Sequence, residues 1–144
     1  MEENKLITID ASVLLKWLIA ESEDMEQAVL LRTHFEKKKV EFIVPSFCFA
    51  EVCNILYRKV PHAAIEFYSY ILELQITEHQ LSFNIVNIAF KLMEQYHAVS
   101  FYDASYHALA ILENGTFITA DKKYYEKTRK EGHIMLLKNY GKKK

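Results

Sequence analysis

Four acidic side chains stand where the sequence predicts strands to end or helices to begin: Asp10, Glu51, Asp103 and Asp121. Asp10 and Asp121 each follow a short apolar run, which is typical of a strand buried on both faces of a parallel sheet. Glu51 and Asp103 each lie in the first turns of a predicted helix. Because such positions face one rim of a parallel sheet, we expect the four carboxylates to converge.

Converging carboxylates need a compensating cation. Two of them about 4 Å apart repel by roughly 4 kcal/mol at an effective dielectric constant of about 20. By capping a helix, each carboxylate would stabilise the fold by only about 0.5–2 kcal/mol. A divalent ion removes the conflict, and carboxylate oxygens with open water positions suit Mg²⁺ or Mn²⁺ better than Zn²⁺. The pattern therefore predicts a magnesium or manganese site.

Each acid taken alone also has a purely structural interpretation. Asp10 or Ser12 suits the N-cap of the helix that follows, and Asp121 is a natural N-cap of its own helix. Asp103 fits a capping box begun by Ser100 and is favoured by the helix dipole. Glu51 recurs with Asn54 and Arg58 at helical spacing, as expected of a solvent-facing stripe. The convergence of all four favours the metal site.

The wider composition limits the classes of protein that need to be considered. The chain has 144 residues, 51% hydrophobic content and a net charge of −1, as expected of one compact domain. With only 3 glycines, it contains no glycine-rich phosphate loop. Any binding to nucleic acid would have to use local basic patches, because the net charge creates no attractive field.

The order of elements predicts an α/β fold with a short parallel sheet. We expect one domain over residues 1–140 and a basic tail over 141–144. Expected strands cover 6–9, 41–44, 73–77 (or an extended link), 116–119 and 134–137, and expected helices cover 13–18, 22–36, 47–58, 62–72, 79–96, 101–113 and 122–130. The helix from residue 22 carries an apolar stripe that includes Val29, and the helix from residue 79 carries one that includes Leu81.

The remaining sequence signals concern location and partners. Cys48 and Cys53 are expected to be buried, unbridged thiols in a reducing compartment. No apolar run has the length or setting of a secretory or membrane-spanning segment, so we expect a cytoplasmic protein without a membrane partner. Some aromatic side chains are expected either to lie in the core or to bind a partner. These are Trp17, Phe47, Phe49, Phe67, Tyr68 and Tyr70.

Four short segments, in this order, resemble motifs of the PIN-domain ribonucleases, and specifically of the VapC-like toxins of toxin–antitoxin pairs. These segments are Ile9-Asp10-Ala11-Ser12, Pro45-Ser46 with Ala50-Glu51-Val52, Ser100-Phe101-Tyr102-Asp103-Ala104, and Ile118-Thr119-Ala120-Asp121-Lys122. Each motif is short, but four in order at these spacings are fairly specific. The resemblance covers nearly the whole chain.

The resemblance implies an α/β/α sandwich around a parallel sheet, with an acidic pocket that binds Mg²⁺ or Mn²⁺ and hydrolyses phosphodiester bonds of single-stranded RNA. By position, Asp10, Glu51 and Asp103 match the principal acidic triad and Asp121 the fourth acid. Ser12 and Thr119 match hydroxyl positions near the pocket. The resemblance also implies a homodimer and a small antitoxin whose basic side chain enters the pocket.

Metal-assisted hydrolysis is the leading hypothesis, with Asp10 and Asp103 holding the main ion and Glu51 or Asp121 acting as general base. His107, four residues after Asp103, is expected in the core or on the surface, unless it makes a supporting contact to the site. One rival is a phosphoacceptor that would use Thr119 and Lys122 beside Asp10. Two further hypotheses are an RNA-processing PIN nuclease outside a toxin pair and a non-catalytic interaction module with a structural ion.

Overall fold

The computed structural model describes residues 5–19 and 23–142 and contains a five-stranded sheet. All its neighbouring strands are parallel, and their order is β3-β2-β1-β4-β5. The strands are β1 (Lys5–Ile9), β2 (Val40–Pro45), β3 (Thr77–His79), β4 (Thr116–Thr119) and β5 (Ile134–Leu136). β1 lies at the centre, so the residue that follows it is flanked by the ends of β2 and β4.

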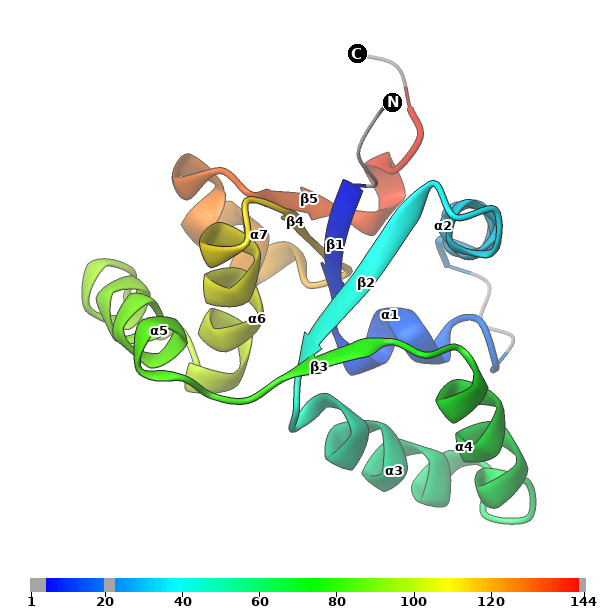
Figure 1. The fold of residues 1–144 in the computed structure, drawn as a ribbon. Coiled ribbons are helices and arrows are strands. Elements are labelled where there is room, and N and C mark those ends of the chain that lie inside the picture. The colour runs from blue at the N-terminus through cyan, green and yellow to red at the C-terminus, as the bar shows by residue number, and fades with distance from the viewer. Residues whose placement is uncertain (1–4, 20–22, 143–144) are drawn as a thin grey trace.

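Helices cover both faces of this sheet. In Figure 1, α5 and α6 lie on one side of the strands and α1 and α2 on the other, which confirms the predicted α/β/α layers. The helices are α1 (Ala11–Leu15), α2 (Met25–Glu36), α3 (Cys48–Lys59), α4 (Ala64–Glu73), α5 (Phe83–Gln95), α6 (Phe101–Leu112) and α7 (Lys122–Thr128), with 3₁₀ turns η1 (Arg129–Glu131) and η2 (Leu137–Asn139). No helix within the described residues is long and apolar enough to cross a membrane.

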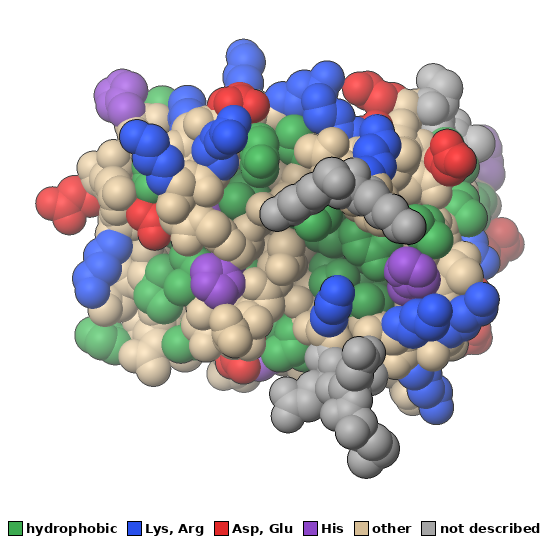
Figure 2. Space-filling view, turned by 90° about the horizontal axis from the view of Figure 1, so that it is seen from above, with side chains coloured by type: hydrophobic (Ala, Val, Ile, Leu, Met, Phe, Trp, Pro, Cys, Tyr) green, Lys and Arg blue, Asp and Glu red, His purple; other side chains and the backbone are tan. Residues whose placement is uncertain are grey.

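The side of the molecule at which β1 begins carries dispersed positive charge. Figure 2 shows this side, with Lys and Arg side chains spread around it and hydrophobic side chains between them. β1 and β2 both run away from it, so the carboxyl ends of these strands lie at the opposite side of the molecule (Figure 1). The rim at which Asp10 follows β1 is therefore on that opposite side.

The core lies around β1, β4 and α6. The last three residues of both strands are buried, as expected of strands covered on both faces. Residues 104–110 of α6 are all buried, because this helix packs across the sheet on one side and against α5 on the other. A helix enclosed in this way holds its first turn firmly at the rim of the sheet.

Side-chain caps begin the helices that follow β1 and β4 and the helix α6. Asp10, rather than Ser12, caps α1, and Ser100 and Asp121 cap α6 and α7 as predicted. The proposed helix start at Ser22 lies outside the described residues, as do the last two lysines of the predicted tail.

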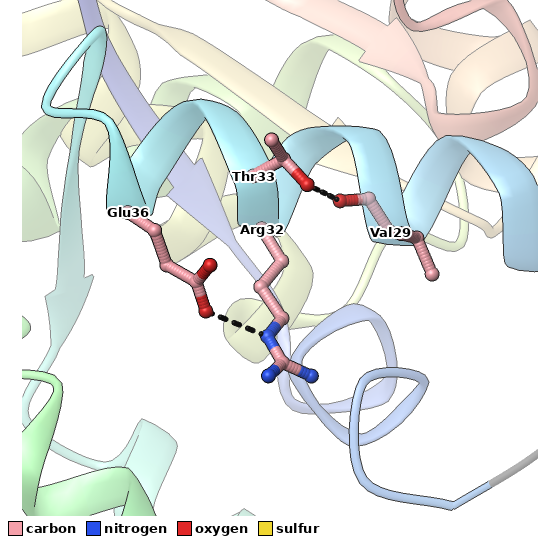
Figure 3. Close-up of polar contacts among 4 residues, drawn as sticks. All are labelled: Val29, Arg32, Thr33 and Glu36. Atoms are coloured by element: carbon pink, nitrogen blue, oxygen red, sulfur yellow. Dashed lines mark hydrogen bonds and ion pairs between the residues drawn. The ribbon is translucent and has the colours of Figure 1, made fainter.

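The exposed side of α2 is stabilised by contacts within the helix, as Figure 3 shows. Arg32 Nε lies 3.0 Å from Glu36 Oε1, and the Thr33 hydroxyl donates to the Val29 carbonyl at 2.9 Å. An exposed ion pair four residues apart contributes about 0.3–0.5 kcal/mol. Val29 itself is 48% exposed, so its predicted place on the buried stripe is wrong, whereas Ala28 and Leu31 are fully buried.

Several boundary and burial predictions need correction. The strand expected over 73–77 is formed by Thr77–His79 instead, because α4 continues through Glu73. The helix expected from His79 begins at Phe83, where Ser82 supplies the cap, and this leaves Leu81 outside the helix and 41% exposed.

Helix α3 buries the face that carries Cys48, Val52 and Leu56. Cys53 lies on the other face and is exposed, so the prediction that both thiols are buried is wrong for this one. Burial raises the pKa of Cys48 to about 12, which keeps that thiol protonated.

The turn between α6 and β4 is where a glycine is required. Asn114 adopts the left-handed conformation, with φ of 56°, that ends the helix. At Gly115 a Cβ atom would lie 2.5 Å from the Leu6 carbonyl oxygen. Gly115 is therefore needed for the close approach of this turn to β1, and Asn114 supplies the left-handed residue.

Candidate active site

Three hydrogen bonds hold Asp10 at the carboxyl end of β1. Its Oδ1 accepts from the Ser12 hydroxyl at 2.6 Å and from the Val13 backbone N–H at 3.0 Å. Its Oδ2 accepts from the Thr119 hydroxyl, 3.0 Å away at the end of β4. Burial raises the pKa of Asp10, whereas these three bonds lower it by favouring the charged form. Both hydroxyls expected near the acidic pocket therefore contact the same carboxylate.

Asp121 is connected to Asp10 through Thr119. The Asp121 backbone N–H donates to the Thr119 hydroxyl oxygen at 3.1 Å, and that hydroxyl donates to Asp10. The Asp121 carboxylate accepts from the Tyr124 backbone N–H at 3.0 Å and so caps α7. Because β1 and β4 are neighbours, Asp10, Thr119 and Asp121 form one hydrogen-bonded group at the rim.

Glu51 reaches the same region from α3. The hydroxyl of Tyr106, on α6, donates to Glu51 Oε1 at 2.8 Å. The Tyr106 ring is 1% exposed and is fixed by stacking on Phe117 and by an edge contact with Phe47. Tyr106 was not predicted from the sequence, because its role depends on how α3 and α6 lie relative to each other in the fold. Its spacing of three residues after Asp103 was the available signal.

Asp103 lies in the first turn of α6, where the Ser100 hydroxyl accepts from its backbone N–H at 3.1 Å. Burial, followed by the charges of Asp121 and Asp10, raises the pKa of Asp103 from 3.8 to about 6, and the charge of Glu51 adds to the shift. Burial also raises the pKa of Glu51, where the charge of Asp10 adds to the effect. Asp103 therefore lies within electrostatic reach of the other three carboxylates, and Asp10 lies within reach of Glu51 and Asp121.

A small cleft lies between the start of α6 and α7. Its volume is about 180 Å³, and Asp103 and Asp121 both line it. Glu51 and Asp10 do not line this cleft. Across the part of the chain that the structure describes, no group of three or more His, Cys, Asp or Glu side chains is arranged to hold a metal ion. The carboxylates therefore lie at one rim of the sheet and their charges raise the pKa of Asp103, but within the described residues they do not form a complete set of metal ligands.

The donor set nevertheless fits a hard divalent cation. All four candidate ligands are carboxylates, which is the ligand chemistry of Mg²⁺ and Mn²⁺. The raised pKa of Asp103 means that its negative charge is disfavoured as it stands, and a cation at the rim would relieve this.

His107 has a structural role in the core. Its ring is buried, Nδ1 lies 2.8 Å from the Tyr124 hydroxyl, and Nε2 lies 2.8 Å from the Gly132 carbonyl oxygen. Because a carbonyl only accepts, Nε2 carries the proton and Nδ1 accepts from Tyr124. Burial lowers the pKa of His107, which keeps the ring neutral. The supporting contact considered for His107 is therefore made to α7 and not to Asp103.

The phosphoacceptor hypothesis requires Thr119 and Lys122 beside Asp10. Thr119 is there, but Lys122 Nζ lies 3.9 Å from Glu23 Oε1 on the exposed surface. Of the aromatic side chains considered for partner binding, Trp17 is buried in the core and the other five are half-buried, of which Phe47, Phe49, Phe67 and Tyr68 pack against it. These observations favour neither the phosphoacceptor nor the interaction module.

A parallel sheet with acidic side chains following β1 and β4 defines an α/β protein with a candidate acidic site at the carboxyl ends of its strands. The model of the PIN domain family matches residues 7–130. This chain belongs to the PIN-domain family, as its four short motifs predicted. Comparison with curated protein sequences finds no match.

Solved structures share this fold at low sequence identity. VapC20 of Mycobacterium tuberculosis, described as a toxin that cleaves the sarcin-ricin loop, has a TM-score of 0.64 at 16% identity over 83% of this chain and 93% of its own. A toxin–antitoxin complex from Klebsiella pneumoniae has a TM-score of 0.67 at 14% identity, over 91% and 97%. VapBC2 from Rickettsia felis, bound to a promoter DNA fragment, has a TM-score of 0.66 at 12% identity, over 91% and 96%. At these identities the comparison establishes the fold.

Proposed function

We propose that this protein is a divalent-metal-dependent endoribonuclease that hydrolyses single-stranded RNA, and that it is the toxin of a toxin–antitoxin pair. The observation that carries this proposal is the electrostatic coupling of Asp10, Glu51, Asp103 and Asp121 at one rim of a PIN-domain sheet. The fold likeness to VapC-type toxins supports the toxin role.

The carboxylates would have two roles, which are binding of the metal ion and acceptance of a proton. Asp10 and Asp103 would hold the main Mg²⁺ or Mn²⁺ ion, and Glu51 and Asp121 would bind it through water or help to seat a second ion. When bound, the ion supplies a water of lowered pKa and offsets charge on the scissile phosphate. Glu51 or Asp121 would accept the proton as general base.

The hydroxyl groups position the carboxylates. The Ser12 hydroxyl and the Val13 N–H both donate to Asp10 Oδ1, and Thr119 donates to Oδ2, which leaves Oδ2 with an accepting lone pair in a fixed direction. The Tyr106 hydroxyl does the same for Glu51.

The proposed partners are a second copy of the chain and a small antitoxin with a basic side chain that enters the acidic rim. The structural relatives include toxin–antitoxin complexes, which supports the antitoxin. An apolar groove between α3 and α4 offers a surface for it, since Tyr57 and Ile65 line the groove and are 72% and 71% exposed. With RNA as substrate and an antitoxin as partner, we expect the protein to act in the cytoplasm.

The test is cleavage of single-stranded and structured RNA with Mn²⁺, with and without a chelator. We expect cleavage of the single-stranded RNA only when Mn²⁺ is free, and we expect Asp10→Asn and Asp103→Asn to abolish it while retaining the native circular dichroism spectrum. Full activity in both variants would overturn the site assignment. Absence of cleavage of any RNA with Mn²⁺ would favour an interaction module.

A further inference from the structure

We propose that Lys123 and Lys127 form a phosphate-binding subsite that holds the RNA backbone beside the scissile bond. This inference rests on the proposed function, because it concerns the substrate of the same site. It starts from the cleft between α6 and α7, which Asp103 and Asp121 share with these two lysines.

The two lysines are presented to the cleft by one helix. They are four residues apart in α7, so they lie on the same face and one turn from each other. Lys127 Nζ donates to the Ala98 carbonyl at 3.3 Å, across the cleft from its own helix. The neighbouring Lys122 does not line the cleft and pairs instead with Glu23 on the surface.

The size and lining of the cleft suit a phosphate group. Its volume of about 180 Å³ is below the roughly 300–1,000 Å³ of pockets that enclose drug-sized ligands, so it would take a small group and not a whole base. Lysine is a common point-charge ligand for phosphate. Two ammonium groups beside Asp103 and Asp121 can hold a phosphodiester next to the carboxylates that would bind the ion.

The overall charge of the chain creates the need for such a subsite. With a net charge of −1, the protein exerts no general attraction on RNA, and the carboxylates at the rim repel it. Backbone affinity must therefore come from lysines or arginines close to the rim. Lys123 and Lys127 satisfy this requirement because they share a cleft with two of the carboxylates.

The experiment measures binding of a fluorescent single-stranded oligouridylate by anisotropy over a range of salt concentrations, with a chelator present so that cleavage does not contribute. We expect the Lys123→Gln, Lys127→Gln double variant to bind about tenfold more weakly at low salt. Its slope of log affinity against log salt should be smaller in magnitude by about 0.7, since the two lysines hold one phosphate and each phosphate contact on a single strand contributes about 0.7. The matched control is Lys122→Gln with Lys130→Gln, which removes the same charge from exposed positions outside the cleft.

The control double variant is expected to bind within about twofold of the native chain. Equal weakening by both double variants would show that only net charge matters and would overturn the subsite. Native affinity in the Lys123, Lys127 variant would also overturn it, and an accompanying loss of affinity for an acidic peptide would assign the cleft to a protein partner.

A cleavage assay separates this inference from the proposed function. With Mn²⁺, the Lys123, Lys127 variant should show a raised KM and an unchanged kcat, because the lysines hold RNA and do not touch the reacting atoms. Persistence of cleavage in Asp10→Asn would refute the proposed catalytic site, and the salt slopes would still report on the lysines. An unchanged KM in the lysine variant would refute the subsite alone.

Discussion

The candidate site is built from two pairs of carboxylates that are held in different ways. Asp10 and Asp121, the strand-end pair, accept from backbone N–H groups and are joined through the Thr119 hydroxyl. Glu51 and Asp103, the helix pair, project from α3 and α6, and the Tyr106 hydroxyl donates to Glu51.

The two pairs differ in their hydrogen bonding: within the described residues, three hydrogen bonds reach the Asp10 carboxylate and one reaches Glu51. Burial raises the pKa of Asp10, as it does for Glu51 and Asp103, and the three hydrogen bonds to Asp10 oppose this shift by favouring the charged form. In the helix pair, burial and neighbouring charge oppose ionisation. We therefore expect that Asp10 fixes the position of an ion more strongly than Glu51 does.

The largest effect is expected from Thr119→Val, which breaks the link between Asp10 and Asp121. The variant leaves one Asp10 oxygen and the Asp121 N–H without their partner, so the free energy of unfolding should fall by about 1–3 kcal/mol. Affinity for Mn²⁺, measured by calorimetry, should fall about 10–100-fold, as is typical when a group that orients a metal ligand is removed.

Thr8→Val is the matched control for this variant. Thr8 is also a fully buried strand residue, but its hydroxyl has no hydrogen-bond partner within the described residues. The same substitution there should leave stability unchanged or improve it, and should leave Mn²⁺ affinity unchanged. Similar losses in the two variants would mean that the Thr119 hydroxyl has no special role at the rim.

The next effect concerns the charge of the helix pair. The pKa of Asp103 is raised from 3.8 to about 6 in the folded protein, so the folded state loses this proton at a higher pH than the unfolded chain. Stability therefore falls as pH rises from about 4 to about 6. Asp103→Asn removes this loss, and without divalent ions it should raise the free energy of unfolding at pH 7 by about 1 kcal/mol after allowance for solvent screening.

The advantage of Asp103→Asn should vanish below about pH 4, where the carboxyl group is protonated in both states. Urea unfolding at several pH values measures it. A gain that is the same at all pH values would show that it does not come from the charge of Asp103.

The smallest effect is expected from Tyr106→Phe, which removes the hydroxyl that donates to Glu51. Glu51 is only half-buried, so water can replace the lost bond. Calorimetry should show Mn²⁺ affinity reduced about twofold to fivefold, equivalent to about 0.5–1 kcal/mol.

The matched control is Tyr124→Phe, because the Tyr124 hydroxyl bonds to His107 and not to a carboxylate. It should lower stability and leave Mn²⁺ affinity unchanged. If Tyr106→Phe weakens Mn²⁺ binding as much as Thr119→Val does, the distinction between the two pairs is wrong.

Much of the local structure was predictable because its causes are local. The buried strand Thr116–Thr119 has the predicted bounds, and the caps at Ser100 and Asp121 are those expected, since a capping side chain bonds to a backbone N–H three residues away. Errors occurred where two signals competed. Leu81 continued an apolar helical pattern, but Ser82 begins α5, and the segment before it pairs with β2 as β3.

The sequence by itself determined that four carboxylates follow strands or open helices, and that motifs of the PIN-domain family accompany them. Only the tertiary structure decided how these groups are held. Thr119 lies 109 residues from Asp10, and Tyr106 lies 55 residues from Glu51, so neither bond follows from spacing along the chain. The parallel order of β1 and β4 and the packing of α6 across the sheet bring these partners together, because long-range contacts arise only when the buried faces of distant elements meet.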